Sequence, residues 1–561
     1  MEFALVAMAI VIIIVVKVSY DNKLYHEKIR QRIKQSFGKI STREYSDDTF
    51  KSIAYYYNKN KNNKTDVDDI TWNDLEMDEI YMLLNNTYSS MGEEYLYAML
   101  HRLEFNPEEL KMRDQIVDYF MTNEQDCMSL SYEFAKLGKM KKNSLYECMN
   151  ALEELKEESI IKHILQAIGL VASVGLVFVL PSIGIILPIF FLTYNIITYY
   201  STRAQFESCL YAVGYINQVV SKANTISALN IEVIQPIMAD VNEGAKAFEK
   251  FRRGAFLIGN GVGNSGNAVD IVMDYVRMMF HIDIIKFYQM LSTFKQNQDK
   301  LKIMYEKLGF LDSCLAIASF RAYLPYYCKP ELDANSPNHL EVEELYHPLI
   351  QNPVTNSIKV DQSVLITGSN ASGKSTFLKT IAMNAILSQT IYTSVSSKYS
   401  ANYYMVASSM ALRDNLMGKE SYYIVEIKSL KRIMDRIQNE IPVLCFVDEV
   451  LRGTNTLERI AASSEILNSM ATSNTICFAA THDIELTHIL EKVYLNYHFQ
   501  EQIVDNNVIF DYKIYEGRAV SKNAIKLLDM IGYSKGIIKR ATDAANHFLA
   551  SGEWIEISNH E

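Results

Sequence analysis

A glycine-rich segment between two apolar runs is the feature that most limits how this chain folds. Residues 368–376 read Gly368-Ser369-Asn370-Ala371-Ser372-Gly373-Lys374-Ser375-Thr376 and fit the pattern G-x-x-x-x-G-K-[ST]. The apolar run Ser363 to Thr367 before it predicts a buried strand, and Thr376 to Leu387 after it predicts a helix. A strand, a glycine loop and a helix in this order predict a P-loop in an α/β domain with a mostly parallel sheet.

Phosphate binding explains each residue type in this loop. Glycines let backbone N–H groups close around an anion, and the following helix N-terminus adds partial positive charge. Lys374 is expected to neutralise the β- and γ-phosphates, and the Ser375 hydroxyl to coordinate Mg²⁺. We therefore predict that the whole loop, Gly368 to Thr376, binds ATP together with Mg²⁺.

Two later apolar runs also end in polar residues. Val443 to Val447 lead into Asp448 and Glu449, and Thr475 to Ala480 lead into Thr481-His482-Asp483. Ligands of open α/β sheets bind at the carboxyl ends of the strands. Asp448 is predicted to hold Mg²⁺, Glu449 to orient the attacking water, and His482 to sense the γ-phosphate. Exposed turn acids and an ordinary strand-end histidine are the plainer alternatives.

Apolar segments elsewhere predict membrane spans. Phe3 to Val16 is almost wholly apolar, and Ile164 to Tyr199 forms two apolar arms around a Pro-Ser break at 181–182. We expect an uncleaved anchor and a transmembrane hairpin, rather than a cleaved signal peptide or a buried core hairpin. Lysines and arginines flank these segments, so the positive-inside rule places the flanks and the P-loop in the cytoplasm. Three spans and a membrane localisation follow.

The remaining chain gives weaker signals. Apolar residues recur at helical spacing in 82–161 and 205–327, which predicts an all-α core, and the polar stretch Lys51 to Asp68 predicts a solvated linker. Gly261 to Gly266 fits G-x-G-x-x-G but lacks the flanking strand and acidic residue, so a plain loop is favoured. A net charge of -11 argues against a strongly basic nucleic-acid binder, and the scattered cysteines argue against a disulfide or zinc framework.

Several segments, taken together, resemble the MutS family of DNA mismatch-repair ATPases. Leu451-Arg452-Gly453-Thr454-Asn455-Thr456 is similar to the "RGTST" segment that follows the second motif in that family. Tyr346-His347-Pro348-Leu349 resembles its R-H-P-hydrophobic segment, and Ala480 to Thr487 resembles A-T-H-x-x-E-L. Gly532 to Ala541 resembles the family's last helix start, while 97–120 and 311–331 resemble the two ends of its helical core.

This resemblance implies a dimeric ATPase with two composite sites. Ser421 would approach the γ-phosphate of the partner subunit, and the adenine pocket would come from Leu349 to Asn356 with Tyr512. DNA would be a partner, with Lys136 to Lys142 as a candidate phosphate-contacting patch. Mismatch readers of the family carry a Phe-x-Glu wedge in an N-terminal domain, for which this chain has no room. Its Phe499-Gln500-Glu501 lies inside the ATPase domain.

The expected organisation is a membrane-anchored MutS-like ATPase without the N-terminal mismatch-recognition domain. Its predicted parts are an anchor (1–20), a juxtamembrane or linker region (21–81), a helical core (82–328) interrupted by the hairpin (164–199), a P-loop ATPase domain (329–545) and a tail (546–561). Two alternatives stay open. One is an ABC-type ATPase for transport or membrane remodelling, and the other is a scaffold that binds ATP without turnover.

Overall fold

A computed structural model describes most of the chain. It leaves out residues 1, 141–142, 181–183, 259–267, 370–371, 411–421, 439, 453, 505–506, 520–524, 526–527, 529–530 and 557–561. Within helices and strands it also leaves out the side chains of 2–15, 18, 208, 256, 268–272, 422, 502–504, 507–508 and 549. The glycine cluster at 261–266, the Pro-Ser break of the hairpin and the side chains of the predicted anchor up to residue 15 therefore lie outside the described residues.

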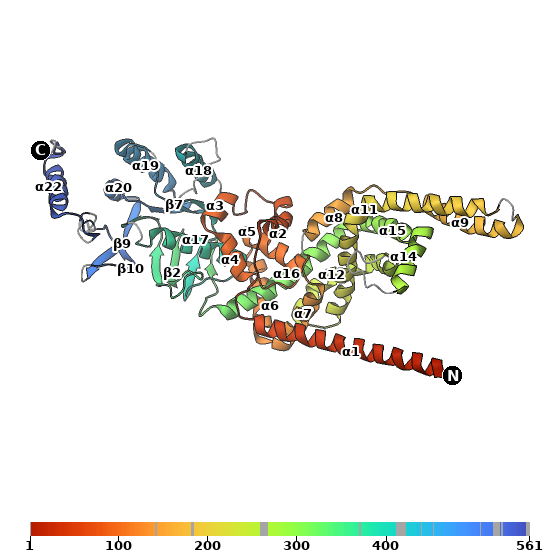
Figure 1. Cartoon of the computed structure of the whole chain (residues 1–561). Helices are drawn as coiled ribbons and strands as arrows, with labels where there is room; N and C mark the ends of the chain where they lie inside the picture. The colour runs from red at the N-terminus through yellow and green to blue at the C-terminus, as the bar shows by residue number, and fades with distance from the viewer. Residues whose placement is uncertain are drawn as a thin grey trace. The chain divides into compact units, whose positions relative to one another are not determined.

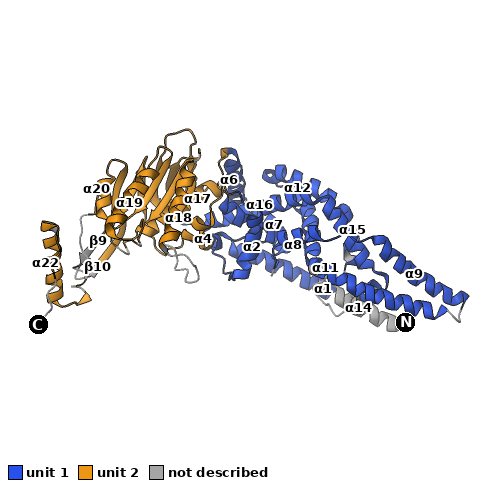
Figure 2. Ribbon diagram, turned by 90° about the horizontal axis from the view of Figure 1, so that it is seen from above, with its two compact units in different colours: residues 1–62, 81–102, 108–325 blue, residues 63–80, 103–107, 326–561 orange. Residues whose placement is uncertain are grey.

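The chain forms two compact units (Figure 2). Unit 1 contains residues 1–62, 81–102 and 108–325, and unit 2 contains 63–80, 103–107 and 326–561. The change from unit 1 to unit 2 at 325/326 lies close to the predicted start of the ATPase domain at 329. The sequence did not predict that 63–80 and 103–107 belong to unit 2.

Unit 1 is helical in its described part (Figure 1). Its helices are α1 (Glu2–Ser36), α2 (Asp47–Lys59), α5 (Ser90–His101), α6 (Pro107–Thr122), α7 (Glu124–Leu137), α8 (Leu145–Glu154), α9 (Ile160–Val179), α11 (Ile186–Ser227), α12 (Gln235–Ala247), α13 (Glu249–Arg252), α14 (Ala268–Phe280), α15 (Ile282–Gln296) and α16 (Gln298–Tyr323). Two 3₁₀ turns, η1 (Glu232–Ile234) and η2 (Ala255–Leu257), lie between them, and α4 (Met77–Leu84) crosses the boundary between the units.

Helices α5 and α16 pack closely in the core of unit 1, and glycine makes this possible. A Cβ on Gly92 would lie 2.1 Å from the Asp312 carboxylate, and one on Gly309 would lie 2.8 Å from the Met91 carbonyl oxygen. The buried Asp312 accepts hydrogen bonds from the backbone N–H and the hydroxyl of Ser89, at 2.8 Å and 2.6 Å. This carboxylate therefore satisfies donors at the start of α5, where a helix has no internal partners.

The solvated linker predicted from Lys51 to Asp68 is wrong for its first half. Residues 47–59 form helix α2, whose Ile53, Tyr56 and Tyr57 are buried. The Tyr56 hydroxyl donates a 2.9 Å hydrogen bond to Glu306. The many polar residues conceal one apolar and aromatic face, and its burial makes this segment part of the core.

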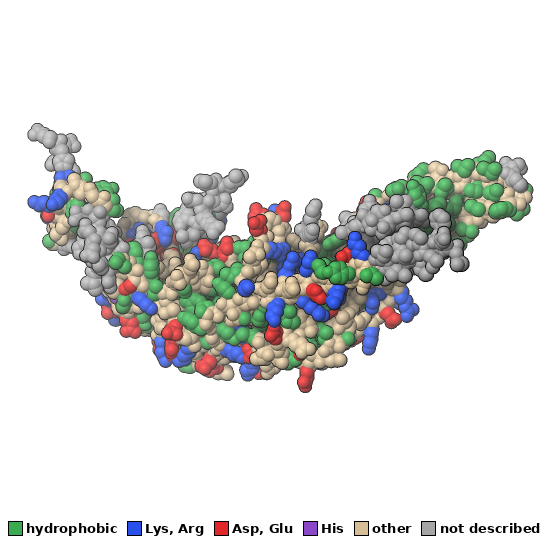
Figure 3. Space-filling model, turned by 60° about the horizontal axis from the view of Figure 1, so that its bottom comes forward, with side chains coloured by type: hydrophobic (Ala, Val, Ile, Leu, Met, Phe, Trp, Pro, Cys, Tyr) green, Lys and Arg blue, Asp and Glu red, His purple; other side chains and the backbone are tan. Residues whose placement is uncertain are grey.

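The predicted hairpin segment lies in α9 and the first part of α11, which we call the arm (residues 160–180 and 185–203). Helix α9 packs against α11, α14 and α15 (Figure 1). Large apolar side chains of the arm are exposed, with Phe178 at 85% and Val179 at 74%. Figure 3 shows this apolar surface at the upper right. Among the described helices, α9 alone is long and apolar enough to cross a membrane, judged by length and composition.

Unit 2 contains two sheets. The larger has the strand order β10-β9-β4-β8-β7-β6, and the smaller has the order β1-β5-β2-β3. In the larger sheet β9, β4, β8, β7 and β6 are parallel, and β10 pairs antiparallel with β9. The strands are β1 (Glu331–Leu332), β2 (Leu340–Leu345), β3 (Asn356–Val360), β4 (Ser363–Thr367), β5 (Lys398–Ala401), β6 (Met405–Ser409), β7 (Val443–Asp448), β8 (Thr475–Ala480), β9 (Tyr494–Val504) and β10 (Asn507–Glu516).

The helices of unit 2 complete an α/β domain with a mixed sheet. They are α3 (Asp69–Asp74), α17 (Lys374–Thr390), α18 (Tyr422–Ile437), α19 (Thr456–Met470), α20 (Ile484–Ile489) and α22 (Lys535–Ser551). Helices α17, α18 and α19 contact strands of the larger sheet. Every residue of β4, β7 and β8 is buried, which explains why these strands could be located from their apolar runs. Helix α22 continues past residue 545, where a tail was predicted.

Candidate nucleotide-binding site

The larger sheet brings the predicted motifs together. Strands β4, β8 and β7 are parallel neighbours, with Ile366 beside Ala480 and Ala480 beside Asp448. The segments that leave their carboxyl ends carry the P-loop, His482 and Glu449 respectively. Residues separated by more than a hundred positions therefore meet at one edge of the sheet, where open α/β sheets bind ligands.

The P-loop has the backbone that its glycines predict. Gly368 and Gly373 have φ values of 147° and 107°, a backbone region that residues with a Cβ atom rarely adopt. A Cβ on Gly368 would also lie 2.8 Å from the Phe499 carbonyl oxygen. Helix α17 starts directly at Lys374, so its N-terminus faces the loop. Asn370 and Ala371 lie outside the described residues.

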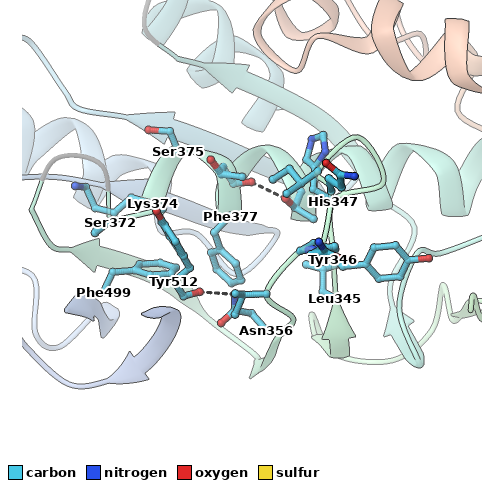
Figure 4. Close-up of a pocket in the computed structure, with 18 of the residues that line it drawn as sticks. Leu345, Tyr346, His347, Asn356, Ser372, Lys374, Ser375, Phe377, Phe499 and Tyr512 are labelled. Atoms are coloured by element: carbon cyan, nitrogen blue, oxygen red, sulfur yellow. Dashed lines mark hydrogen bonds between the residues drawn. The ribbon is translucent and has the colours of Figure 1, made fainter. Parts of the chain in front are cut away.

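Lys374 is a buried cation that points back over its own loop. Its side chain is drawn in Figure 4, and the residue is only 5% exposed. The ammonium group donates hydrogen bonds to the carbonyl oxygens of Gly368 and Ser369, at 2.8 Å and 2.7 Å. Burial lowers the pKa of Lys374, and the nearby carboxylates of Asp448 and Glu449 act in the opposite direction. A bound polyanion would stabilise this charge further.

Ser375 and Asp448 form the pair expected to hold a metal ion. The Ser375 hydroxyl lies 2.5 Å from Asp448 Oδ2 and donates to it. Asp448 is 6% exposed, and its other oxygen, Oδ1, is buried without a hydrogen-bond partner among the described residues. A buried carboxylate oxygen without a donor is costly, and a hard cation such as Mg²⁺ would satisfy it. The donor set therefore fits Mg²⁺.

Glu449 is held between the side chains of His482 and Arg452 in an unusual backbone conformation. Its φ is 59°, and its backbone N–H donates to the Ala480 carbonyl oxygen at 2.9 Å. The carboxylate pairs with His482 Nε2 at 2.9 Å and with Arg452. Burial would raise the pKa of Glu449, but the hydrogen bond from His482 and the charges of Arg452 and Lys374 outweigh it and hold this pKa low. The carboxylate is therefore ionised and able to accept a proton or orient water.

A cavity of about 710 Å³ adjoins these groups, large enough for a nucleotide. Its wall includes Lys374, Glu449, His482, the predicted adenine-pocket segment near 350–356, and Tyr512. The Asn356 amide donates to the Tyr512 carbonyl oxygen and accepts from the Ile514 backbone N–H, both at 2.9 Å. This clamp holds Tyr512 at a φ of 55°, beside an irregularity in the β10–β9 pairing, with its ring against Gly373 (Figure 4).

Some site residues were not assigned by sequence reasoning. Phe499 lines the cavity, and Glu501 accepts a 2.7 Å hydrogen bond from the Ser369 hydroxyl. Both come from β9, far along the chain, and the Phe-x-Glu pattern that they match belongs to a mismatch wedge and does not predict a nucleotide site. Arg452 lies in the segment quoted for the family resemblance, but its ion pair with Glu449 was not predicted. Ser421, the residue expected to reach the partner subunit, lies outside the described residues.

A second ion pair fixes the segment after β8. Arg459 on α19 donates two hydrogen bonds to Asp483, at 2.9 Å and 2.6 Å. Asp483 directly follows His482, so this bidentate pair ties the histidine loop to the helix that follows the second motif. Taken with the sheet order and the glycine loop, these contacts give unit 2 the architecture that is typical of a P-loop domain.

Comparisons with known proteins find one family that this part of the chain resembles. Residues 364–549 match the family model described as MutS domain V. DNA mismatch repair protein MutS of Clostridium kluyveri is 29% identical over 251 residues, covering 42% of this chain and 28% of that protein. MutS of Thermotoga maritima is 29% identical over 258 residues, covering 44% and 32%, and MutS protein homolog 4 of Mus musculus is 27% identical over 290 residues, covering 48% and 29%.

The domain match and these relatives show that part of this chain is similar to MutS proteins. The chain spans less than a third of the length of each of these relatives, at 28%, 29% and 32%. The likeness therefore concerns residues 364–549 for the family model and less than half of this chain for each of these relatives.

Proposed function

We propose that unit 2 binds ATP with Mg²⁺ and hydrolyses it. One observation carries this proposal: Lys374, Ser375, Asp448, Glu449 and His482 converge at the carboxyl ends of three neighbouring strands. The cavity beside them has the volume of a nucleotide site. Buried charges of both signs at one sheet edge are expensive to maintain without a ligand that pairs with them.

Each group would have a distinct task. Lys374 and the loop backbone would bind the phosphates, and Mg²⁺ held by Ser375 and Asp448 would neutralise charge that develops on them. Glu449 would orient the attacking water and accept its proton, because its carboxylate stays ionised. His482, which contacts Glu449 at 2.9 Å, would hold that carboxylate in place and face the γ-phosphate.

The nucleotide base would lie in the same cavity, beside Tyr512. The Tyr512 ring is placed against Gly373 by the Asn356 clamp and lines the cavity with Val354 and Pro353. An aromatic ring at this position can stack on a purine. We therefore propose that Tyr512 binds the base, in line with the family resemblance.

We further propose that the chain works as a homodimer through unit 2 and acts on DNA. The relatives named DNA mismatch repair protein MutS support this step, and Ser421 would then complete the partner's site. The surface gives less support. In the candidate patch, Lys136 pairs with Glu133 at 3.9 Å and Lys139 pairs with Glu93 at 2.9 Å, which reduces their availability for phosphates.

Membrane attachment is the remaining part of the proposal. The exposed apolar side chains of the arm support insertion of this region into a bilayer, and so do the basic residues at or next to its ends, Lys156, Lys162 and Arg203. The apolar sequence before Lys17 supports a further span, which would complete three and leave unit 2 in the cytoplasm. The same arm favours a second candidate function, an ABC-type ATPase that works on the bilayer itself.

One experiment separates these functions. ATP hydrolysis by the detergent-purified chain is measured alone, with homoduplex DNA, with mismatched or branched DNA, and with liposomes. Stimulation by DNA supports the MutS-like function, and stimulation by liposomes alone supports work on the bilayer. Binding of ATP without turnover under every condition would overturn the proposed hydrolysis and leave an ATP-binding scaffold.

A further inference from the structure

Helix α18 carries a carboxylate on its buried face. The buried residues of this helix are spaced three and four apart and lie on one side, which faces the sheet: Glu426, Ser429, Leu430 and Ile433. Glu426 is 6% exposed. Glutamate is among the residues least often buried, and a buried one needs a partner to be tolerated. The contacts of Glu426 should therefore explain why it is there.

The carboxylate binds the backbone of the turn that carries Glu449. The Leu451 N–H donates to Glu426 Oε1 at 2.5 Å. Burial raises the pKa of Glu426, while the Leu451 and Arg452 backbone groups act in the opposite direction. Glu426 therefore contacts the turn between β7 and α19, two residues after Glu449, and is not itself among the residues that line the cavity.

This turn needs support from outside. Glu449 and Leu451 both have a φ of 59°, a conformation that residues with side chains rarely adopt. Such backbone persists only where its surroundings determine it from several sides. Here the Ala480 carbonyl oxygen accepts from the Glu449 N–H, the Ser463 hydroxyl donates to the Val450 carbonyl at 3.3 Å, and Glu426 accepts from Leu451.

Helix α18 is itself held in place by contacts with strand β6 and helix α3. Arg432 donates to the Ser408 carbonyl oxygen at the end of β6. Arg436 pairs with Asp68, the N-cap of α3, at 2.9 Å. Glu426 is thus presented from a helix anchored to the edge strand and to α3, so it can impose a position on the turn.

We propose that Glu426 is a positioning residue that aims the Glu449 carboxylate by holding the turn from Glu449 to Arg452. This inference rests on the proposed hydrolysis of ATP. Glu426 does not line the cavity or contact the Lys374 ammonium group, so its removal should change the rate of hydrolysis more than the affinity for ATP.

The test compares Glu426→Ala, Glu426→Gln and Glu426→Asp with the exposed control Asp435→Ala on the same helix. Turnover and the Kd for ATP are measured for each in the full chain. We expect Glu426→Ala to lower kcat at least about tenfold, part of what a positioned base supplies, with Kd changed less than about threefold. Glu426→Gln keeps an acceptor oxygen at the same distance from the helix and should keep most of the wild-type rate. Glu426→Asp has a shorter side chain, which moves the acceptor oxygen away from the Leu451 N–H, and should lose rate as Glu426→Ala does.

A double variant tests whether Glu426 acts through Glu449. If Glu426 acts through Glu449, then Glu426→Ala in a Glu449→Gln protein should change the residual rate less than about twofold. An equal loss in both backgrounds, or a normal kcat for Glu426→Ala and Glu426→Asp, would overturn the inference. Loss of ATP binding with a lowered Tm in both variants would assign Glu426 to fold stability alone and would also overturn it. Wild-type protein without turnover would instead overturn the proposed hydrolysis, and this inference with it.

Discussion

The nucleotide site and the arm depart from ordinary burial in opposite directions. At the site, charged residues are buried, with Lys374 at 5% and Asp448 at 6% exposure. On the arm, apolar residues are exposed, with Phe178 at 85% and Val179 at 74%. Buried charges require a charged partner, and a large exposed apolar surface requires an apolar one. These two departures are the observations behind two parts of the proposed function, a magnesium polyphosphate at the site and a bilayer around the arm.

At the nucleotide site, the largest effect is expected from Glu449→Gln. The amide keeps the size of the side chain but cannot accept a proton, so we expect kcat to fall by about 10²–10⁴ while ATP binding is retained. Turnover is measured by phosphate release, and binding by titration with a fluorescent nucleotide. Glu458→Gln, an exposed acid in the first turn of α19, is the matched control. Near-normal turnover of Glu449→Gln would contradict its role.

Charged side chains placed on the arm should oppose its proposed insertion into a bilayer. Val171 and Val174 are exposed on α9. Each lysine placed in a membrane segment costs about 2.5–3.5 kcal/mol, so the double change to lysine should shift the protein out of the membrane fraction. Flotation with liposomes measures this. The control Ile303→Lys alters an exposed apolar residue of α16 in the same unit. Unchanged flotation of the arm variant would argue against insertion.

Lys374→Ala should weaken ATP binding rather than turnover alone. Removing a charged donor to the phosphates costs about 1.5–3 kcal/mol, which corresponds to about a 10- to 150-fold higher Kd. Lys492→Ala changes an exposed lysine of the same unit and should leave Kd unaltered. An unchanged Kd for Lys374→Ala would mean that the nucleotide binds elsewhere.

A smaller effect is expected from Tyr512. Replacing the ring by Ala removes stacking on the base and should raise the Kd for ATP by about three- to tenfold, whereas Tyr512→Phe should be close to neutral. The comparison of ATP with tripolyphosphate tests the cause, because only the nucleotide has a base to lose contact with. Equal weakening for both ligands would contradict base stacking.

The pH dependence gives the smallest and most specific effect. His482, Arg452 and Lys374 together outweigh burial and hold the pKa of Glu449 below its ordinary value of 4.5. A base is active above its pKa, so the acid limb of kcat due to Glu449 should lie below about pH 4.5. His482→Gln removes one of these contributions and should move that limb to higher pH. A limb that stays in place or moves lower would show that His482 does not stabilise this carboxylate.

Much of unit 2 could be predicted from sequence because phosphate chemistry restricts residue types. The loop from Gly368 to Thr376 and the buried strands at 363–367, 443–448 and 475–480 follow from short patterns. Glu426, Phe499 and Glu501 could not be found in this way. They meet the motif residues only through the order of the strands and the face of a helix, which no local pattern encodes.

Unit 1 was harder to predict because composition alone permits several structures. The polar stretch at 51–59 is a packed helix, since three residues in one helical stripe, Ile53, Tyr56 and Tyr57, suffice to bury it. The apolar stretch at 164–199 was predicted to form two spans. Its second half is the start of the 42-residue helix α11, which continues into the rest of unit 1. The insertion of segments 63–80 and 103–107 into unit 2 leaves no local signal in the sequence.

The most direct test of the central claim is a structure of the Glu449→Gln protein with ATP and Mg²⁺. The account predicts the triphosphate at the loop 368–376 with Lys374 on its β- and γ-phosphates, and the metal ion at Ser375 and Asp448. The base should lie against Tyr512. A nucleotide bound at another place, or a metal ion distant from Asp448, would contradict it.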